Sequence, residues 1–341
     1  MSGFGIDLGT SNTVVCHQRL GIVLDEPSVM VVRTEHLNNN HGRQVTPLMV
    51  GREAHALIGR CPVGLAAVRP LHDGVIVDLE SARAFMVAVL SRLNANPWQR
   101  FRPRAVIGVP AGATALERRA VLEAADEAGI HRVQLVPEPI AGALGCGINP
   151  LEPRAHMVVD VGGGTSEVTG FCYGGVMAHR SCRVAGDEMT LALYQYLRSE
   201  HQLVVGELTA ESVKCEVATA ERASLVAQGL DTVTGRPRLV TLTVAEVVEA
   251  LRPTADEIIA ILAQCLEDLP PQAVSDILEE GVWAFGGGSL LRGFGNLLED
   301  AFGFPVRFAE RPLTCVAEGA AACRAHPEVL NAFDAELVAV G

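Results

Sequence analysis

The chain has 341 residues, of which 49% are hydrophobic and 20% are charged, and it carries a net charge of −13 at pH 7. A chain of this length and apolar content can bury a large core in two or more domains, which excludes a disordered protein. The net negative charge argues against nucleic acid as a general partner, because proteins that bind nucleic acid need a basic surface to contact the phosphates.

No apolar run reaches the roughly 18 residues of a membrane-spanning helix. The first residues lead directly into an apolar strand, which leaves no room for a signal peptide, and we therefore expect an intracellular protein. Nine cysteines are scattered along the chain without a C-x-x-C pair. This odd, dispersed set indicates reduced thiols in the core, with metal or disulfide roles as the alternative.

The first predicted element is a strand that ends at Asp7, followed by a polar turn and a β-branched return strand. The turn contains Gly9, Thr10, Ser11 and Asn12. Backbone N–H groups in such a turn can converge on an anion, so the hairpin is a candidate phosphate loop. An ordinary glycine-rich β-hairpin has a similar composition, and the matching segment at residues 156–168 by itself leaves both interpretations open.

Residues 52–59 predict a short helix, and residues 79–94 carry apolar side chains at helical spacing. The loop that follows has Trp98 and Phe101 among arginines. These aromatic rings either pack back onto their own domain or contact lipid head groups, where aromatic residues flanked by arginine are favoured. A single loop of this kind is a weak membrane anchor unless a polymer presents many copies.

Glu138 stands between two prolines, where a predicted strand ends and a helix of small residues begins. The prolines hold this carboxylate rigidly at the place where two halves of the protein should meet. Such a group could orient or deprotonate the water that attacks a γ-phosphate. The alternative is an ordinary glutamate at a helix N-terminus, which the helix dipole favours.

A second hairpin, at residues 156–168, has the same order of features as the first. Its strand contains Asp160, which is placed to hold a hydrated Mg²⁺, and its turn consists of Gly162, Gly163, Gly164 and Thr165. Such long-range self-similarity implies two related half-structures. Facing each other across a cleft, the two hairpins would hold a polyphosphate from both sides, with Asp7 and Asp160 around one metal ion.

Residues 206–217 predict a helix with Thr209 as its cap. Glu211 and Lys214 lie three positions apart on that helix. They either touch a base or ribose or form an ordinary solvated pair. Further along, residues 244–269 predict a long helical region that is interrupted at Pro253, because proline lacks the N–H that a helix interior needs.

A third glycine-rich turn follows an apolar strand and opens a predicted helix. It contains Gly286, Gly287 and Gly288. A close backbone approach at a helix start suits the ribose or α-phosphate end of a nucleotide. Each of the three turns is weak evidence by itself, but their order along the chain is a stronger signal.

Four short motifs occur in an order that resembles the superfamily of actin, sugar kinases and heat-shock chaperone ATPases. They are Ile-Asp-Leu-Gly-Thr at 6–10, Pro-Glu-Pro-Ile-Ala at 137–141, Asp-Val-Gly-Gly-Gly-Thr at 160–165 and Phe-Gly-Gly-Gly-Ser at 285–289. Within that superfamily the chain is similar to the MreB family of bacterial actins. This closer resemblance is carried by tracts outside the nucleotide loops, at residues 21–29, 66–76, 113–120, 206–211 and 312–317.

The resemblance implies an α/β, actin-like ATPase fold, in which two related α/β domains, each with a small subdomain, surround a central nucleotide cleft. It places subdomain IB at residues 32–67 and subdomain IIB at residues 181–244. The two larger subdomains are discontinuous in the chain. Subdomain IA takes residues 1–31, 68–139 and 312–327, and subdomain IIA takes residues 140–180 and 245–311.

The resemblance also implies that ATP and Mg²⁺ occupy the cleft and that the chain is a weak ATPase whose hydrolysis is coupled to polymerisation. Asp7 and Asp160 would hold the metal, and Glu138 would act in hydrolysis together with Asp160. By matched position, the residues that would contact the nucleotide are Asp7, Gly9, Thr10, Ser11, Asn12, Gly162, Gly163, Gly164, Thr165, Gly186, Glu211, Lys214, Gly286, Gly287 and Gly288.

Double protofilaments, membrane association and guidance of the wall synthesis that sets cell shape are further implications of the resemblance. The expected partners are other copies of the chain, the membrane surface and membrane-bound wall-synthesis proteins. The expected location is the cytoplasm, at the inner face of the cell membrane, with Trp98 and Phe101 as the lipid contact. Ala185 replaces a glycine that is usual in the family, and such departures leave room for a paralogue that positions another cargo.

Two other functions of the superfamily remain open. A chaperone-like ATPase would normally continue into a peptide-binding domain, for which this sequence has no residues, but it could act alone through a partner. A small-molecule kinase needs a catalytic base beside an acceptor pocket. Asp7 or Asp187 could serve as that base, but no additional sugar-binding cluster is visible.

Overall fold

The computed structural model describes residues 3–34, 45–72, 75–76, 78–95, 104–219, 221 and 223–339. The predicted lipid contacts Trp98 and Phe101 lie outside the described residues. Within the described ranges, none of the helices combines the length and the apolar character that a bilayer crossing requires.

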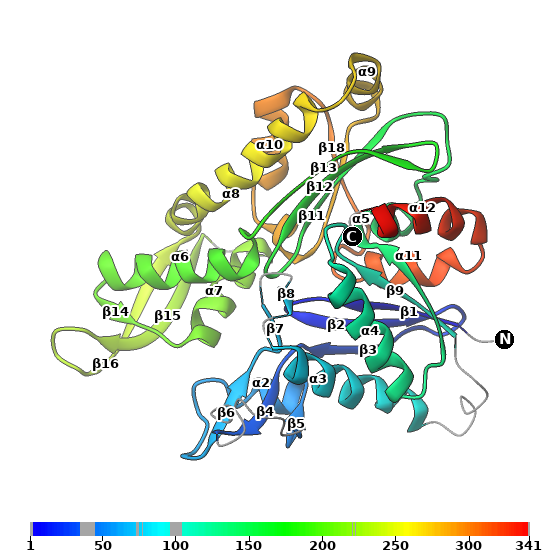
Figure 1. Cartoon of the computed structure of the whole chain (residues 1–341). Helices are drawn as coiled ribbons and strands as arrows, with labels where there is room; N and C mark the ends of the chain where they lie inside the picture. The colour runs from blue at the N-terminus through cyan, green and yellow to red at the C-terminus, as the bar shows by residue number, and fades with distance from the viewer. Residues whose placement is uncertain are drawn as a thin grey trace.

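Two five-stranded sheets form the frame of the molecule (Figure 1). The first has the order β10-β9-β1-β2-β3 and the second has the order β13-β12-β11-β17-β18. The strands of the first sheet are β1 (Gly3–Leu8), β2 (Asn12–His17), β3 (Gly21–Pro27), β9 (Arg104–Val109) and β10 (Arg132–Pro137). Those of the second are β11 (His156–Val161), β12 (Ser166–Cys172), β13 (Gly175–Cys182), β17 (Val282–Phe285) and β18 (Val306–Phe308).

The two sheets repeat one topology, which supports the two related halves that the hairpins predict. Strand β1 is antiparallel to β2 and parallel to β9, and β11 is likewise antiparallel to β12 and parallel to β17. Both glycine turns therefore leave the central strand of their sheet at the same edge. This places Asp7 and Asp160 at equivalent positions near the ends of β1 and β11.

Helices cover both faces of each sheet. Helices α3 (Leu79–Ser91) and α4 (Ala115–Glu127) share a core with the first sheet, and α8 (Val244–Glu267), α9 (Pro271–Glu280) and α10 (Phe294–Phe302) share one with the second. Between the two sheets lie α5 (Glu138–Gly145), α11 (Cys315–Cys323) and α12 (Pro327–Ala339). This middle layer contains Ile140, Phe171 and Phe285, which are fully buried.

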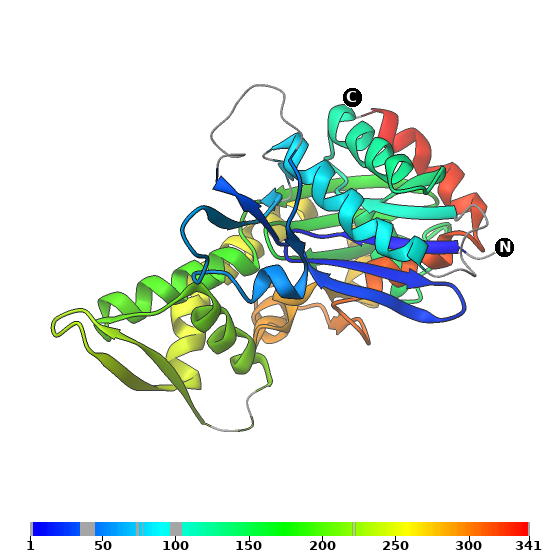
Figure 2. The same ribbon diagram turned by 90° about the horizontal axis from the view of Figure 1, so that it is seen from below.

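Two smaller units extend from the frame toward the same side (Figure 2). One has the sheet order β5-β4-β6 and the other has the order β14-β15-β16, and a two-stranded pair, β7-β8, lies next to the first. The elements of the first unit are β4 (Met30–Arg33), β5 (Met49–Val50), α2 (Arg52–His55) and β6 (Leu65–Val68). The neighbouring pair consists of β7 (Leu71–His72) and β8 (Val75–Ile76). Those of the second are α6 (Gly186–Ser199), β14 (Leu203–Val204), α7 (Glu207–Thr219), β15 (Ser224–Asp231) and β16 (Pro237–Thr243). The exact subdomain limits stay a prediction.

Two expectations about helices were wrong. Helix α8 is continuous through Pro253. Leu251 and Ile258 on either side of it are fully buried against the second sheet, so tertiary packing outweighs the lost hydrogen bond. Helix α7 begins at Glu207, because the Gly206 carbonyl already accepts hydrogen bonds from the backbone of the following turn, and Thr209 is therefore inside the helix and not its cap.

Short 3₁₀ segments take the place of regular helix at two positions. η1 (Arg92–Ala95) forms the last part of the helix predicted at residues 79–94, and η3 (Gly287–Leu290) begins inside the third glycine turn, at its second glycine. The third turn therefore opens a 3₁₀ segment, and α10 starts only after it.

Candidate functional site

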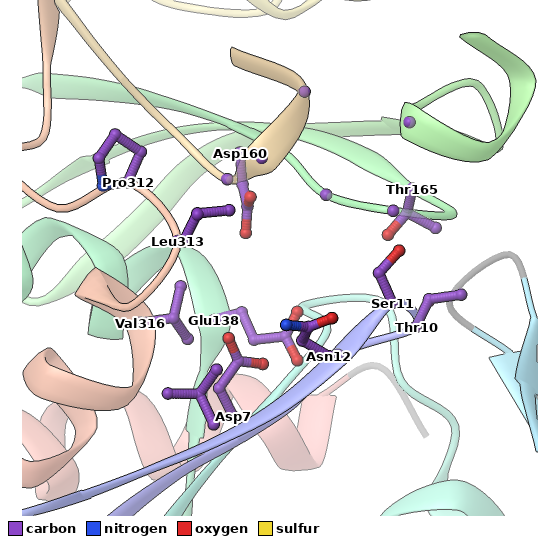
Figure 3. Close-up of a pocket in the computed structure, with 18 of the residues that line it drawn as sticks. Asp7, Thr10, Ser11, Asn12, Glu138, Asp160, Thr165, Pro312, Leu313 and Val316 are labelled. Carbon is purple, nitrogen blue, oxygen red and sulfur yellow. The ribbon is translucent and has the colours of Figure 1, made fainter. Parts of the chain in front are cut away.

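A cavity of about 540 Å³ lies between the two sheets and is lined by residues from both. This volume is in the range of small-molecule and cofactor sites. Figure 3 shows that the side chains of Asp7, Glu138 and Asp160 face this space, as do the hydroxyl groups of Ser11 and Thr165. The cavity therefore brings together the two hairpins that the sequence places 150 residues apart.

The first glycine turn is hydrogen-bonded to the segment that leads into β4. The Ser28 hydroxyl donates to the Gly9 carbonyl at 2.6 Å, and the Ser28 backbone N–H donates to the Ser11 carbonyl at 2.8 Å. Asn12 donates from Nδ2 to Asp25 at 2.9 Å. A Cβ at Gly9 would lie 2.8 Å from the Asn12 carbonyl oxygen, so a side chain would force this turn to open. Gly9, Thr10, Ser11 and Asn12 all line the cavity.

The second glycine turn touches the first. A Cβ at Gly163 would lie 2.1 Å from Ser11 Oγ, and Gly162 donates its N–H to the Thr165 carbonyl at 2.9 Å. The carbonyls of Gly162 and Gly163 accept backbone hydrogen bonds from the first residues of α6, at 3.1 Å and 2.7 Å. Gly162, Gly163 and Thr165 line the cavity, and Gly164 is in the same turn without lining it.

Three carboxylates, Asp7, Glu138 and Asp160, line the cavity, and a fourth, Glu167, is buried next to them. Burial, followed by repulsion from Asp160, raises the pKa of Asp7 to about 7, and burial with repulsion from Glu167 raises that of Asp160 to about 7. The pKa of Glu138 is also raised well above its usual value, by burial and then by Asp7, Glu167 and Asp160. Such a cluster is unfavourable without a cation, because each ionised carboxylate disfavours the next.

Glu167 is a site residue that sequence reasoning missed. It is opposite Asp160 in the β11–β12 pairing, so the two side chains share one face of the sheet. The side chain is only 5% exposed, and burial raises its pKa to about 7 although the Ala111 N–H donates to it at 3.4 Å. The available signal was the single charged residue in a return strand that is buried along most of its length.

The donor set of the cleft fits Mg²⁺ that arrives with phosphates. No group of three Asp, Glu, His or Cys side chains converges closely enough to hold a metal ion, as far as the described residues show. Mg²⁺ usually keeps several waters and binds through one or two carboxylates plus substrate phosphates. Asp7 and Asp160 would be those two carboxylates, and the excess negative charge around them is what a cation would offset.

On the other side of the cavity, Lys214 and Glu211 form an ion pair at 2.7 Å. Lys214 Nζ also donates to the Gly186 carbonyl at 2.7 Å, and the Thr190 hydroxyl donates to Glu211. Burial opposes ionisation of Glu211, yet Lys214 and these hydrogen bonds hold its pKa below the usual value. Gly186, Glu211 and Lys214 all line the cavity, so this charged pair is directed into the site.

The third glycine turn closes the cavity from the side of the second sheet. Gly286 has a φ of +81°, and a Cβ there would lie 2.3 Å from the Val161 carbonyl oxygen and 2.5 Å from Asp160 Oδ1. Its N–H donates to the Pro312 carbonyl at 3.0 Å, which connects the turn to the segment before α11. Gly286, Gly287 and Gly288 line the cavity, and their role beside the nucleoside stays a prediction.

Two sheets of the same topology, on either side of an acidic cleft that is lined by three glycine turns, define an actin-like protein. A crystal structure of MreB5 of Spiroplasma citri bound to AMPPNP superposes with a TM-score of 0.85 at 30% sequence identity, over 96% of this chain and 97% of that one. The structure of a MamK double helical filament superposes with a TM-score of 0.74 at 25% identity, over 95% of this chain and 98% of that one.

The particular family is shown by sequence. A family model described as MreB/Mbl protein matches residues 1–332, and the chain belongs to that family. Its relatives include the cell shape-determining protein MreB of Escherichia coli, which is 40% identical over 318 residues and covers 92% of this chain and 90% of its own length. The predicted fold class and the resemblance are therefore confirmed.

Proposed function

We propose that this chain binds ATP with Mg²⁺ in the cleft, hydrolyses it slowly and assembles with copies of itself into double protofilaments. The observation that carries the proposal is the meeting of two matching glycine hairpins over an acidic cavity of about 540 Å³. MreB5 bound to AMPPNP and the double helical MamK filament support nucleotide binding and self-association, respectively.

In this proposal, the backbone N–H groups of residues 9–12 and 163–165 bind the phosphates from opposite sides. Asp7 and Asp160 would hold Mg²⁺, which when bound neutralises charge on the phosphate oxygens. Lys214 and Glu211, held by Gly186 and Thr190, contact the ribose or base.

Glu138 and Glu167 would position the attacking water. Both side chains are in the carboxylate cluster, and the rigid Pro137–Pro139 backbone at the start of α5 fixes the direction of Glu138. A bound cation lowers the raised pKa of these groups, so that a carboxylate is available to accept a hydrogen bond from water and orient it.

We further propose that the filament acts at the inner face of the cell membrane, in the cytoplasm, and organises membrane-bound wall-synthesis proteins that set cell shape. The name of the Escherichia coli relative, a cell shape-determining protein, supports this role. The proposed lipid contact is the loop with Trp98 and Phe101, whose rings would enter the head-group layer. Filament avidity would add up many such weak contacts.

The test is sedimentation with negative-stain microscopy of the purified chain in Mg·ATP, in Mg·ADP and without nucleotide. Filaments that form only with nucleotide, together with phosphate release, are the expected result. A monomer under all three conditions despite tight ATP binding would contradict polymerisation and favour a partner-driven chaperone-like ATPase or a small-molecule kinase.

Membrane binding is tested by repeating the sedimentation with anionic liposomes. Co-sedimentation of the filaments, reduced in a Trp98→Ala/Phe101→Ala variant that still polymerises, is the expected result. Equal lipid binding by the variant would remove this loop as the anchor.

A further inference from the structure

The two helices that connect the halves of the protein touch through their backbones. Helix α5 continues from β10 of the first sheet and leads toward β11 of the second, and α11 packs against β1. A Cβ at Gly145 would lie 2.1 Å from the Cys315 carbonyl oxygen, and one at Gly319 would lie 1.7 Å from the Ala141 carbonyl oxygen. Helix α5 contacts strands of both sheets, whereas α11 contacts strands of the first, so a shift of one sheet relative to the other bears on the contact between the two helices.

Both helices also carry residues of the nucleotide cleft. Glu138 is the first residue of α5, and Val316 near the start of α11 lines the cavity together with Pro312 and Leu313 just before it (Figure 3). A change in how α5 sits on α11 would therefore be felt directly in the cleft. Two rigid halves joined in this way close and open by hinge or shear motion.

Two cysteines meet at this contact. Cys146 caps the C-terminus of α5 and Cys315 is the first residue of α11. The backbone of Gly145, next to Cys146, touches the Cys315 carbonyl, and the two thiols interact there. The Cys315 thiol also donates to the Pro312 carbonyl at 3.6 Å. Both are free thiols. Cys315 is only 1% exposed, whereas Cys146 is partly exposed at the surface. One thiol of the pair is thus reachable by a small molecule, and the other is buried directly behind it.

We propose that Cys146 and Cys315 form a reversible disulfide that fixes α5 to α11 and so locks the two halves of the cleft. This inference takes up, for two of the nine cysteines, the disulfide role that the sequence left as the alternative to reduced core thiols. The chain passes from the first sheet to the second through α5, and the bond would tie the end of α5 to the start of α11. It would therefore resist movement of α5 against α11 when the cleft opens.

The oxidant in the proposal is a low-molecular-weight disulfide such as oxidised glutathione. The Cys146 thiolate attacks one sulfur of it, which forms a mixed disulfide and releases one glutathione thiolate. The Cys315 thiolate then attacks the Cys146 sulfur, which forms the protein disulfide and releases the second glutathione. Two protein thiols lose two electrons and two protons, and the glutathione disulfide gains them to give two thiols.

The second step is the slow one. The hydrogen bond to Cys146 and then burial raise the pKa of Cys315 far above its usual value, so its thiolate is rare at neutral pH. Closure of the disulfide should therefore accelerate by about tenfold per pH unit, in proportion to the thiolate fraction. Because closure is slow, the disulfide would form under sustained oxidation and would not form during a brief exposure to oxidant.

The bond is tested by incubating the reduced full-length chain with oxidised glutathione, alkylating the remaining thiols and mapping peptides without reduction. A peptide that links Cys146 to Cys315, absent from Cys146→Ser and Cys315→Ser variants, is the expected result. Cys172→Ser is the matched control, because Cys172 is another partly exposed thiol, and it should leave the linked peptide unchanged. Alkylation of both cysteines, or a stable glutathione adduct on Cys146 alone, would overturn the proposal.

The lock itself rests on the proposed nucleotide function and is tested by release of a fluorescent ADP analogue. Oxidised wild type should release it about tenfold more slowly than oxidised Cys146→Ser, and a reductant should abolish the difference, because release needs an open cleft. Equal rates would overturn the lock. If the reduced chain binds no nucleotide, the proposed function fails. The lock is then tested by hydrogen exchange, which should be slower in α5 and α11 of the disulfide form than in the reduced form; equal exchange would overturn the lock.

Discussion

The carboxylate cluster predicts an unusual dependence of stability on pH. Asp7, Asp160 and Glu167 have pKa values of about 7 in the folded protein, against ordinary values of 3.8 for aspartate and 4.5 for glutamate. The folded, nucleotide-free protein therefore binds more protons than the unfolded chain between these values and about pH 7. Its free energy of unfolding should fall as the pH rises through this window.

The magnitude follows from the pKa values. For Asp7, the difference between 3.8 and about 7 corresponds to about 4 kcal/mol of lost stability in total, of which about 3 kcal/mol falls between pH 5 and pH 8. The other carboxylates act in the same direction, but they repel one another and their contributions do not add. His17 and His179 act oppositely below about pH 6.5, because burial lowers their pKa values.

The assay is urea unfolding followed by circular dichroism at pH 5, 6, 7 and 8, at constant ionic strength and without nucleotide. Asp160→Asn is the matched variant, because it removes one carboxylate and leaves both histidines in place. Wild type should lose on the order of 3 kcal/mol more than the variant over this range. Mg²⁺ with nucleotide should flatten the wild-type curve. Parallel curves for the two proteins would refute the reasoning.

Three substitutions test the cleft in other ways. Glu138→Ala should retain ATP binding but slow single-turnover hydrolysis by about 10² or more, since it removes the water-positioning group; unchanged turnover would exclude Glu138 from the mechanism. Asp160→Ala should weaken Mg·ATP binding measured by calorimetry, and normal affinity would show that the metal is held elsewhere. Gly286→Ala should lower the stability by about 2 kcal/mol more than Gly293→Ala, because both have positive φ but only the former has backbone within contact of a new Cβ; equal losses would argue against that close contact.

Much of the cleft could be predicted because its chemistry is local in sequence. Each of the first two glycine turns directly follows an apolar strand that has an aspartate near its end, so Asp7 and Asp160 could be matched without knowing the fold. The repeat then implied two facing halves, and the two sheets have the same topology. Glu138 was recognisable because two prolines flank it.

Features that depend on contacts between distant segments were not predictable. Glu167 enters the site only through its register opposite Asp160. Pro253 stays in a continuous helix because the residues around it are buried against a sheet. Cys146 and Cys315 meet only because α5 and α11 cross at small residues, and no spacing in the sequence indicates that contact.

The repeated sheets carry unlike attachments, and this has a consequence for any assembly. One half bears the β5-β4-β6 unit and the other bears the larger β14-β15-β16 unit with α6 and α7. The core is thus nearly two-fold symmetric, whereas the whole molecule has two different ends. Copies stacked head to tail through such ends form an open, heterologous series, and every strand built this way has a direction. Growth and loss of subunits would then proceed at different rates at its two tips.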